Sequence, residues 1–512
     1  MSFFESLVAL LLAAIVLLQV ARRLSVPYPA MLALAGVGLG LIPGSPRITL
    51  DPHTALALFI APALVDAAFD FPAATARRMW RPLVALAVVA VLLSTAAVAW
   101  LGVAVAGLPL YAAIALGAIV APPDAAAASA TLGSVDMPRR SIAVLKGESL
   151  LNDASALLLF GAATAVQSNG GIDGGIALQL GLAVPGGVLM GLALAWAMKR
   201  VQRFVTGTLG GNLLEFVTTF AAWILAERLG LSAVLCLVTF AMAIARSAGL
   251  QTPPRMRVHS FAVWSSVVFL LNVVAFLLMG LQARIIVSAM EPERLWQAAR
   301  FAGLVVVCIV VVRMGWVLAY NRLARHLPLL RGDQKPATLR QGVLVGWAGM
   351  RGLLTLATAF ALPRDFPQRD LIVLTAFAAV LATLVIQGLT LAPLVRLLGL
   401  GDTKRDRALD EARVALADSA LATLAGAQGP AAEHWRYGYE TTRAAAMGER
   451  GGDALEEKRR VGRKALYRER KRLEELRAEQ RIDSDEYLAL QEQLDFQELA
   501  LSSEDERRIE ES

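Results

Sequence analysis

The chain has 512 residues, 56% of them hydrophobic, and a mean hydropathy of +0.57, which is too apolar for an ordinary soluble protein. Its formal net charge of +7 is unevenly divided, because residues 401–512 hold 20 Lys and Arg against 26 Asp and Glu. The basic excess therefore lies in the apolar residues 1–400, where it indicates membrane topology rather than nucleic-acid binding.

Apolar runs of about 18–25 residues, each long enough to cross a bilayer as a helix, follow one another along residues 1–400. We predict about thirteen such spans, near residues 3–20, 26–43, 52–71, 82–106, 109–133, 141–166, 174–198, 212–229, 231–249, 260–282, 299–321, 339–362 and 371–398. Loops on alternate sides of these spans hold 18 against 7 basic residues. Because cytoplasmic loops are the basic ones, we expect the N-terminus outside and residues 401–512 in the cytoplasm.

Two predicted spans are interrupted. Span 109–133 contains Pro122-Pro123-Asp124, where proline breaks the helical hydrogen bonds and leaves free carbonyls. Span 339–362 contains three glycines around Arg351. The two breaks lie seven spans apart, which predicts two inverted repeats joined by the seventh span. Broken helices at matching positions of inverted repeats indicate the binding site of a secondary transporter.

The span 141–166 contains the run from Lys146 to Asp153, KGESLLND, with three charged side chains. Charges at membrane depth are costly unless they are paired, hydrated or neutralised, so they mark a candidate functional site. Glu148 and Asn152 share one helix face, and Ser149 and Asp153 form the adjacent stripe. The alternative is that these residues only pack helices together or lie at a solvated helix end. This interpretation would leave several charges in the membrane without a partner.

These groups suit the exchange of a proton for a cation. A carboxylate in a partly dry cavity is shifted towards its neutral form, so it can alternate between a proton and a cation. Asp153, Asp124, Ser149 and freed carbonyls near Pro123 can supply oxygen ligands for a monovalent cation. The buried Arg351 is expected to need a carboxylate partner, because a guanidinium stays protonated.

Two motifs resemble signatures of one transporter family. The run Gly147-Glu148-Ser149-Leu150-Leu151-Asn152-Asp153 looks like the signature of the monovalent cation:proton antiporters, in the branch of bacterial sodium/proton antiporters and animal sodium/proton exchangers. The run Gly346-Trp347-Ala348-Gly349-Met350-Arg351-Gly352 is similar to the second signature of that branch. Weaker resemblances begin at Glu215, at Ala226 and at Leu384.

The resemblance implies an all-α polytopic membrane protein of about thirteen helices, forming a homodimer in membrane lipid. Its moving core would comprise spans near 82–166 and 299–398, and its dimer platform spans near 3–71 and 174–282. It would exchange sodium or potassium for protons across the inner membrane of a bacterial cell by an elevator-like movement. It would be a transporter and not an enzyme, and it would need no cofactor.

The resemblance also implies roles for individual residues. Asp153 would carry the ion and the proton, and Asp124, Ser149 and the carbonyl of Pro123 would line the cation site. Glu148 would lie beside the cation site and would form a structural ion pair with Arg351. Asn152, where electrogenic relatives have a second aspartate, implies electroneutral one-for-one exchange.

The chain departs from the family pattern at two positions. The usual Thr-Asp-Pro of the first break is Pro123-Asp124-Ala125, so a threonine hydroxyl is lost while the backbone carbonyl remains. Lys146 stands where an acidic residue is common.

Residues 401–512 hold 46 charged side chains and predict a helical hairpin. Its first helix should run roughly over 454–480, and Asp483 with Glu486 should form a capping box that starts the second. The sequence indicates no partner for this tail. Its charged run is typical of a solvated helix face, and a role in regulation or self-association is the alternative.

A different function, sodium-coupled solute symport, would need a pocket for an organic substrate beside the ion site. Two further alternative functions, a membrane sensor and an intramembrane hydrolase, have no supporting motif in the sequence.

Overall fold

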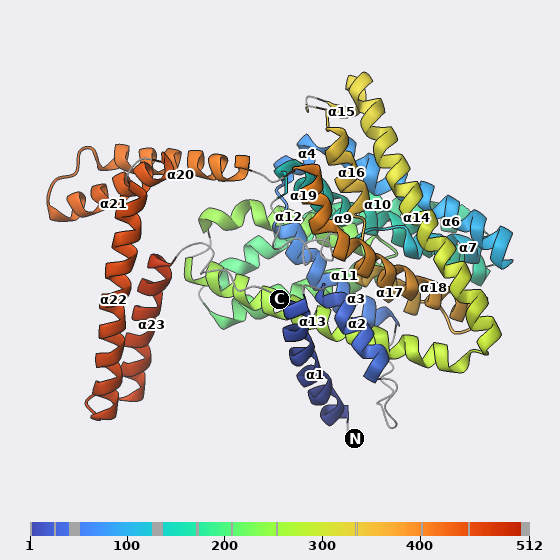
Figure 1. The fold of residues 1–512 in the computed structure, drawn as a ribbon, viewed down its shortest axis with the longest axis horizontal. Coiled ribbons are helices and arrows are strands. Elements are labelled where there is room, and N and C mark those ends of the chain that lie inside the picture. Colours follow the sequence, from blue (N-terminus) through green and yellow to red (C-terminus); the bar gives the residue numbers. More distant parts are fainter. Residues whose placement is uncertain are drawn as a thin grey trace. The chain divides into compact units, whose positions relative to one another are not determined.

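The structure is a computed structural model, and it describes residues 3–24, 27–39, 52–124, 137–169, 171, 174–205, 208–251, 254–332, 334, 336–400, 403–448 and 451–502. Every regular element within these ranges is a helix, as the predicted all-α class requires. The chain divides into two compact units, one over residues 1–401 and the other over 402–511. Figure 1 draws the second unit in orange and red.

The first part of the membrane unit contains helices in the regions of the predicted spans, whose exact number stays a prediction. Its elements are α1 (Phe3–Leu24), α2 (Tyr28–Leu39), α3 (Pro52–Phe69), α4 (Ala73–Arg78), α5 (Trp80–Val84), the π-helical turn η1 (Ala85–Val89), α6 (Ala90–Ala106), α7 (Leu110–Val120) and α9 (Arg139–Asn169). The second half of the predicted span 109–133 lies outside the described residues. Helix α7 ends just before Pro122 and Pro123, which lack the N–H groups needed to continue it.

The second part begins with long helices and ends with short ones. It comprises α10 (Gly174–Val205), α11 (Leu209–Arg228), α12 (Ala233–Gln251), α13 (Pro254–Ala289), α14 (Pro292–His326), α15 (Pro328–Arg331), α16 (Leu339–Trp347), α17 (Leu353–Phe360), α18 (Arg369–Ala382), the π-helical turn η2 (Thr383–Gln387) and α19 (Gly388–Leu398). Helices α16 and α17 are the two halves of the predicted broken span 339–362. A capping box of Thr338 and Gln341 starts α16.

The length and composition of the helices agree with a membrane protein. Within the described residues, six helical segments are long and apolar enough to cross a bilayer alone, among them Trp80–Ala106 and Pro292–His326. Shorter apolar helices, such as α2, α3 and α7, accompany them. The first of the six passes through η1, where the Ala85 carbonyl accepts a hydrogen bond from the Trp316 indole N–H at 2.8 Å. A tertiary contact therefore supports this π-helical turn.

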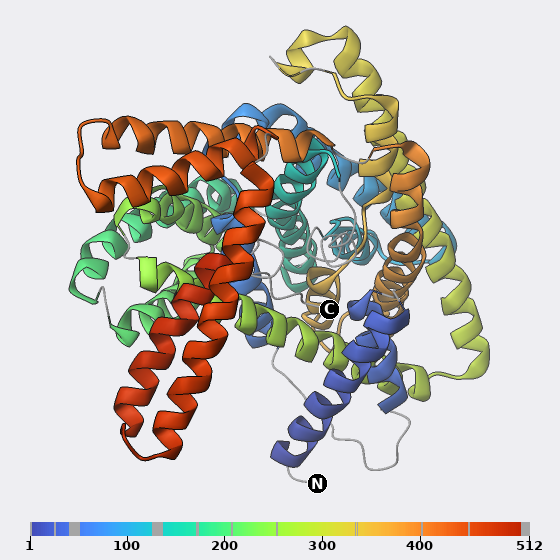
Figure 2. The ribbon, with the colours of Figure 1, turned by 60° about the vertical axis from the view of Figure 1, so that its left-hand side comes forward.

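The tail unit consists of α20 (Thr403–Leu424), α21 (Pro430–Ala446), α22 (Gly451–Ala478) and α23 (Ser484–Leu501). Helices α22 and α23 run side by side as a hairpin (Figures 1 and 2). The predicted capping box of Asp483 and Glu486 is confirmed, and both of its hydrogen bonds are present. Arg470 of α22 joins the two helices, because it bonds both Asp495 and Glu498 at 2.5 Å.

Candidate functional site

The two interrupted helices of the membrane unit meet at their breaks. The backbone N–H of Asp124, four residues beyond the end of α7, donates to the carbonyl of Met350 at 2.7 Å. The backbone N–H of Leu353, the first residue of α17, donates to Asp124 Oδ2 at 3.2 Å. The Asp124 carboxylate therefore lies at a helix N-terminus, where unpaired N–H groups and the helix dipole favour negative charge.

Two glycines of the second break permit this close approach. A Cβ atom on Gly352 would overlap the carboxylate of Asp124, and one on Gly349 would overlap the guanidinium of Arg313. Neither glycine has a positive φ, so the requirement is for space and not for backbone conformation. The glycine spacing that resembled a family signature thus has a direct steric reason in this fold.

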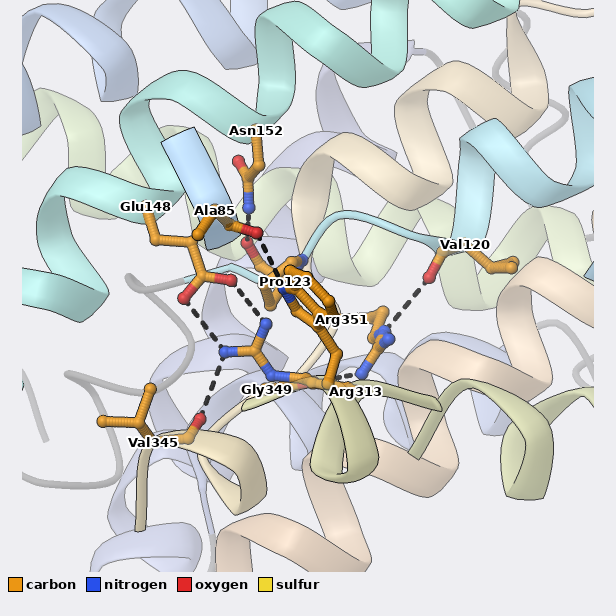
Figure 3. A network of polar contacts seen from close by, with 10 residues as sticks. Ala85, Val120, Pro123, Glu148, Asn152, Arg313, Val345, Gly349 and Arg351 are labelled. Carbon is orange, nitrogen blue, oxygen red and sulfur yellow. Dashed lines mark hydrogen bonds and ion pairs between the residues drawn. The ribbon is translucent and has the colours of Figure 1, made fainter. Parts of the chain in front are cut away.

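The buried carboxylate of Glu148 on α9 forms an ion pair with Arg313 of α14, as Figure 3 shows. The pair is bidentate: Arg313 Nη1 contacts Oε1, and Nη2 donates to Oε2 at 3.0 Å. The Arg313 side chain is 2% exposed and the Glu148 side chain is 1% exposed. Arg313 Nη2 also donates to the carbonyl of Val345, in the last turn of α16, at 3.1 Å.

The predicted ion pair between Glu148 and Arg351 is therefore wrong. Arg351 is fully buried, but its side chain points to the end of α7 (Figure 3). Its Nε donates to the carbonyl of Val120 at 3.1 Å, and its Nη1 donates to the carbonyl of Gly349. The last carbonyls of a helix have no intrahelical partner and carry the negative end of its dipole, so they can hold a guanidinium without a carboxylate.

Asn152 ties α9 to the break that follows α7. Its fully buried side chain donates from Nδ2 to the carbonyl of Pro123 at 2.8 Å. Pro123 is a predicted cation ligand, and this bond occupies one side of its carbonyl oxygen. Since a carbonyl oxygen has two lone pairs, the other remains as an acceptor.

Asp153 differs from the other buried carboxylate of α9. Its side chain is 9% exposed, and it makes no hydrogen bond or ion pair with the residues that the structure describes. It lies near enough to Asp124 for the two carboxylates to interact electrostatically. Ser149, which is half-buried, lies one turn earlier on α9. An unpaired carboxylate in a mostly buried place can bind either a proton or a cation, because both need the same oxygens.

Two contributors to the site were not predicted in their roles. Arg313 is a lone basic residue within an apolar run, a pattern that indicates a buried charge but not which group it contacts. Thr383, the first residue of η2, accepts the backbone N–H of Arg351 on Oγ1 at 3.0 Å. A threonine in an apolar helix carries no signal of such a contact, because it more often bonds its own helix.

Comparison with known proteins agrees with this geometry. The family described as "Sodium/hydrogen exchanger, transmembrane" matches residues 8–397. An uncharacterised Na⁺/H⁺ exchanger of Mycobacterium tuberculosis is 30% identical over 97% of this chain and 95% of its own length. The Na⁺/H⁺ antiporter NhaS2 of Synechocystis is 30% identical over 77% of this chain and 71% of its own length.

A solved structure shares the fold. The sodium proton antiporter MjNhaP1 of Methanocaldococcus jannaschii is 16% identical, with a TM-score of 0.57, over 78% of this chain and 100% of its own. Together, the family match over most of the membrane unit, the full-length relative and the contact of the segment after α7 with the α16–α17 break, called the crossing below, identify the chain as a member of the sodium/hydrogen exchanger family.

Proposed function

We propose that this protein exchanges sodium or potassium ions for protons across the cytoplasmic membrane of a bacterial cell, with Asp153 as the group that binds both. One observation carries this proposal. Of the two buried carboxylates on α9, Glu148 is held by Arg313, whereas Asp153 has no such partner among the described residues. Burial disfavours an unpaired charge, so Asp153 gains by taking up either a proton or a cation.

The cation would bind between α9 and the two breaks. Asp124, Ser149 and the second lone pair of the Pro123 carbonyl would complete the oxygen ligands, with Glu148 close by in its ion pair with Arg313. Hard monovalent cations prefer such carboxylate, hydroxyl and carbonyl oxygens. A relative in Bacillus pumilus, described as a sodium, potassium, lithium and rubidium/H⁺ antiporter, supports a site open to several alkali ions; it is 28% identical over 72% of this chain and 57% of its own length.

We further propose that the site moves as one body, by an elevator-like movement within a homodimer. The spans near 82–166 and 299–398 would form the moving core, and those near 3–71 and 174–282 the platform. The basic loops support an outside N-terminus and a cytoplasmic tail. Asn152 in place of a second aspartate supports one-for-one, electroneutral exchange. The comparisons give no support to the alternative of sodium-coupled symport.

Proton flux in proteoliposomes tests the exchange. Purified protein would be reconstituted with a pH-sensitive dye in the lumen, and sodium, potassium or lithium chloride would be added outside. Antiport moves protons out as the cation enters, so the lumen should become alkaline without any organic solute. Asp153→Asn should abolish this flux while the protein keeps its unfolding temperature.

The matched control is Asp370→Asn, which removes an exposed carboxylate at the start of α18 and should leave the flux unchanged. Cation-driven flux at the wild-type rate in Asp153→Asn would refute the role of Asp153. A wild-type protein that moves protons only when an organic solute is present would refute antiport itself.

A further inference from the structure

A cavity of about 550 Å³ lies within the membrane unit, apart from the crossing of the α7 end with the α16–α17 break. It is lined by residues of α3, α10, α11, α12 and α13, which are labelled in Figure 1. None of the residues of the crossing, such as Asp124, Asp153 or Arg351, lines it. Its volume falls within the range of roughly 300–1,000 Å³ that is typical of small-molecule sites.

Aromatic side chains form much of the cavity wall. Phe69 comes from α3, Phe240 from α12, and Phe261 and Trp264 from α13. The Trp264 ring stacks on Phe216, with ring centroids 4.4 Å apart and planes at 24°, and this contact holds it in place. Such walls favour a ligand with a hydrocarbon or aromatic body.

The charged groups of the cavity are mainly acidic. Asp66, Asp70 and Glu215 line it, and Arg257 is the one basic residue among the lining residues that the structure describes. Their formal charges sum to −2. An organic anion would be repelled by this set, and a cation would be attracted.

Glu215 is held in one orientation by two donors from α13. Its Oε2 accepts a hydrogen bond from the Ser260 hydroxyl at 2.7 Å and another from the Trp264 indole N–H at 3.0 Å. Its Oε1 accepts no hydrogen bond from the described part of the chain. One carboxylate oxygen is thus fixed at the wall of the cavity with its acceptor capacity unused.

A small inorganic cation fits this cavity poorly, because the described residues include no group of three acidic, His or Cys side chains close enough together to hold a metal ion, and the aromatic wall supplies no oxygens. We propose that the cavity binds an amphipathic organic monocation, with its ammonium or guanidinium head on Glu215 and its apolar body against the aromatic wall. Charge-assisted hydrogen bonding to Oε1 would fix the head, and the ring of Trp264 would add a cation–π contribution.

Calorimetric titration of the detergent-solubilised full chain tests this site. The probe is 4-phenylbutylammonium, compared with the neutral 4-phenylbutanol and the anionic 4-phenylbutyrate. The wild-type protein should bind the ammonium saturably and in preference to both comparators. Glu215→Gln should weaken binding of the ammonium about tenfold or more, because a charge-assisted hydrogen bond becomes a neutral one. It should leave binding of the alcohol unchanged.

The matched control is Glu227→Gln, which removes an exposed carboxylate from the same helix outside the cavity and should leave both affinities unchanged. Two exposed lining residues give independent variants in case Glu215→Gln fails to fold. Asp70→Asn should weaken binding of the ammonium alone, and Phe261→Ala should weaken binding of the ammonium and the alcohol alike. Equal ammonium affinity in the wild type and in Glu215→Gln or Asp70→Asn, tighter binding of the anion, or partitioning into detergent without saturation would overturn the proposal.

Discussion

Two buried arginines lie at the crossing, and they bind different groups. Arg313 neutralises Glu148 and covers the end of α16 through Val345, whereas Arg351 covers the end of α7 through Val120. Removing one member of a buried ion pair strands the other charge, whereas removing both can be nearly neutral. The two arginines should therefore respond differently when Glu148 is changed.

Arg313→Gln should lower the free energy of unfolding by about 3–5 kcal/mol, because it leaves the Glu148 carboxylate buried and unpaired. Adding Glu148→Gln should restore most of the loss. Arg351→Gln should show no such rescue by Glu148→Gln. Thermal unfolding of the solubilised protein measures all of these effects, with Arg322→Gln, an exposed change on the same helix α14, as the control. Additive losses in the Arg313 and Glu148 pair would argue against the ion pair.

At this scale the sequence identified the chemical groups but not all of their pairings. The charges between Lys146 and Asp153 are unusual in an apolar helix. Because charged side chains are costly within a membrane, their presence indicates a functional site. Arg313 and Arg351 each stand alone in an apolar span, so spacing along the chain does not tell which one reaches Glu148. That choice depends on the helix end that each arginine meets, which is a property of the packed helices.

At the scale of elements, the breaks were predictable and the smaller irregularities were not. Pro122 and Pro123 forbid continuation of α7, and the glycine-rich segment separates α16 from α17. By contrast, residues near 82–106 were predicted as one regular span, whereas the helical segment starts at Trp80 and passes through η1. No propensity marks a π-helical turn among Ala, Leu and Val residues, because a distant indole, that of Trp316, supports it.

Gly352→Ala should disable the crossing without unfolding the helices. Its Cβ would overlap the Asp124 carboxylate, which would have to leave the N–H of Leu353. Displacing a ligand by about an ångström can reduce a rate about tenfold or more. We therefore expect cation-dependent proton flux to fall by that factor.

Gly303→Ala is the control, because it lies in α14 with open space around the added Cβ. Flux should be measured at equal amounts of reconstituted protein. An unchanged rate in Gly352→Ala would mean that the position of Asp124 does not matter for exchange.

At the scale of the whole molecule, the membrane unit and the tail are separate compact units that differ in composition. The mycobacterial relative aligns over 97% of the chain, so its similarity extends over most of the tail. The sequence predicted the helical hairpin of the tail from a capping box and from charge, because those signals are local. It could not predict the joining contact of Arg470 with Asp495 and Glu498, because several arginines of α22 could reach α23 equally well.

Exchange should be independent of membrane potential. With Asp153 as the one carboxylate that changes its bound ion, each cycle trades one positive charge for another and moves no net charge. Sodium-driven proton flux would be measured in proteoliposomes with the potential clamped by potassium and valinomycin. The rate should be the same at potentials of opposite sign. A steep dependence would show that a second carboxylate, Asp124, also exchanges its proton.

The bonds from Asn152 to Pro123 and from Arg351 to Val120 have a consequence for the affinity of the site on the two sides of the membrane. They connect α9, α7 and the α16–α17 break, so the proposed ligands would keep their spacing wherever the site opens. The carrier would then have the same intrinsic dissociation constant for its cation on both sides of the membrane. Half-saturating cation concentrations measured from the two sides would then differ only through the local pH.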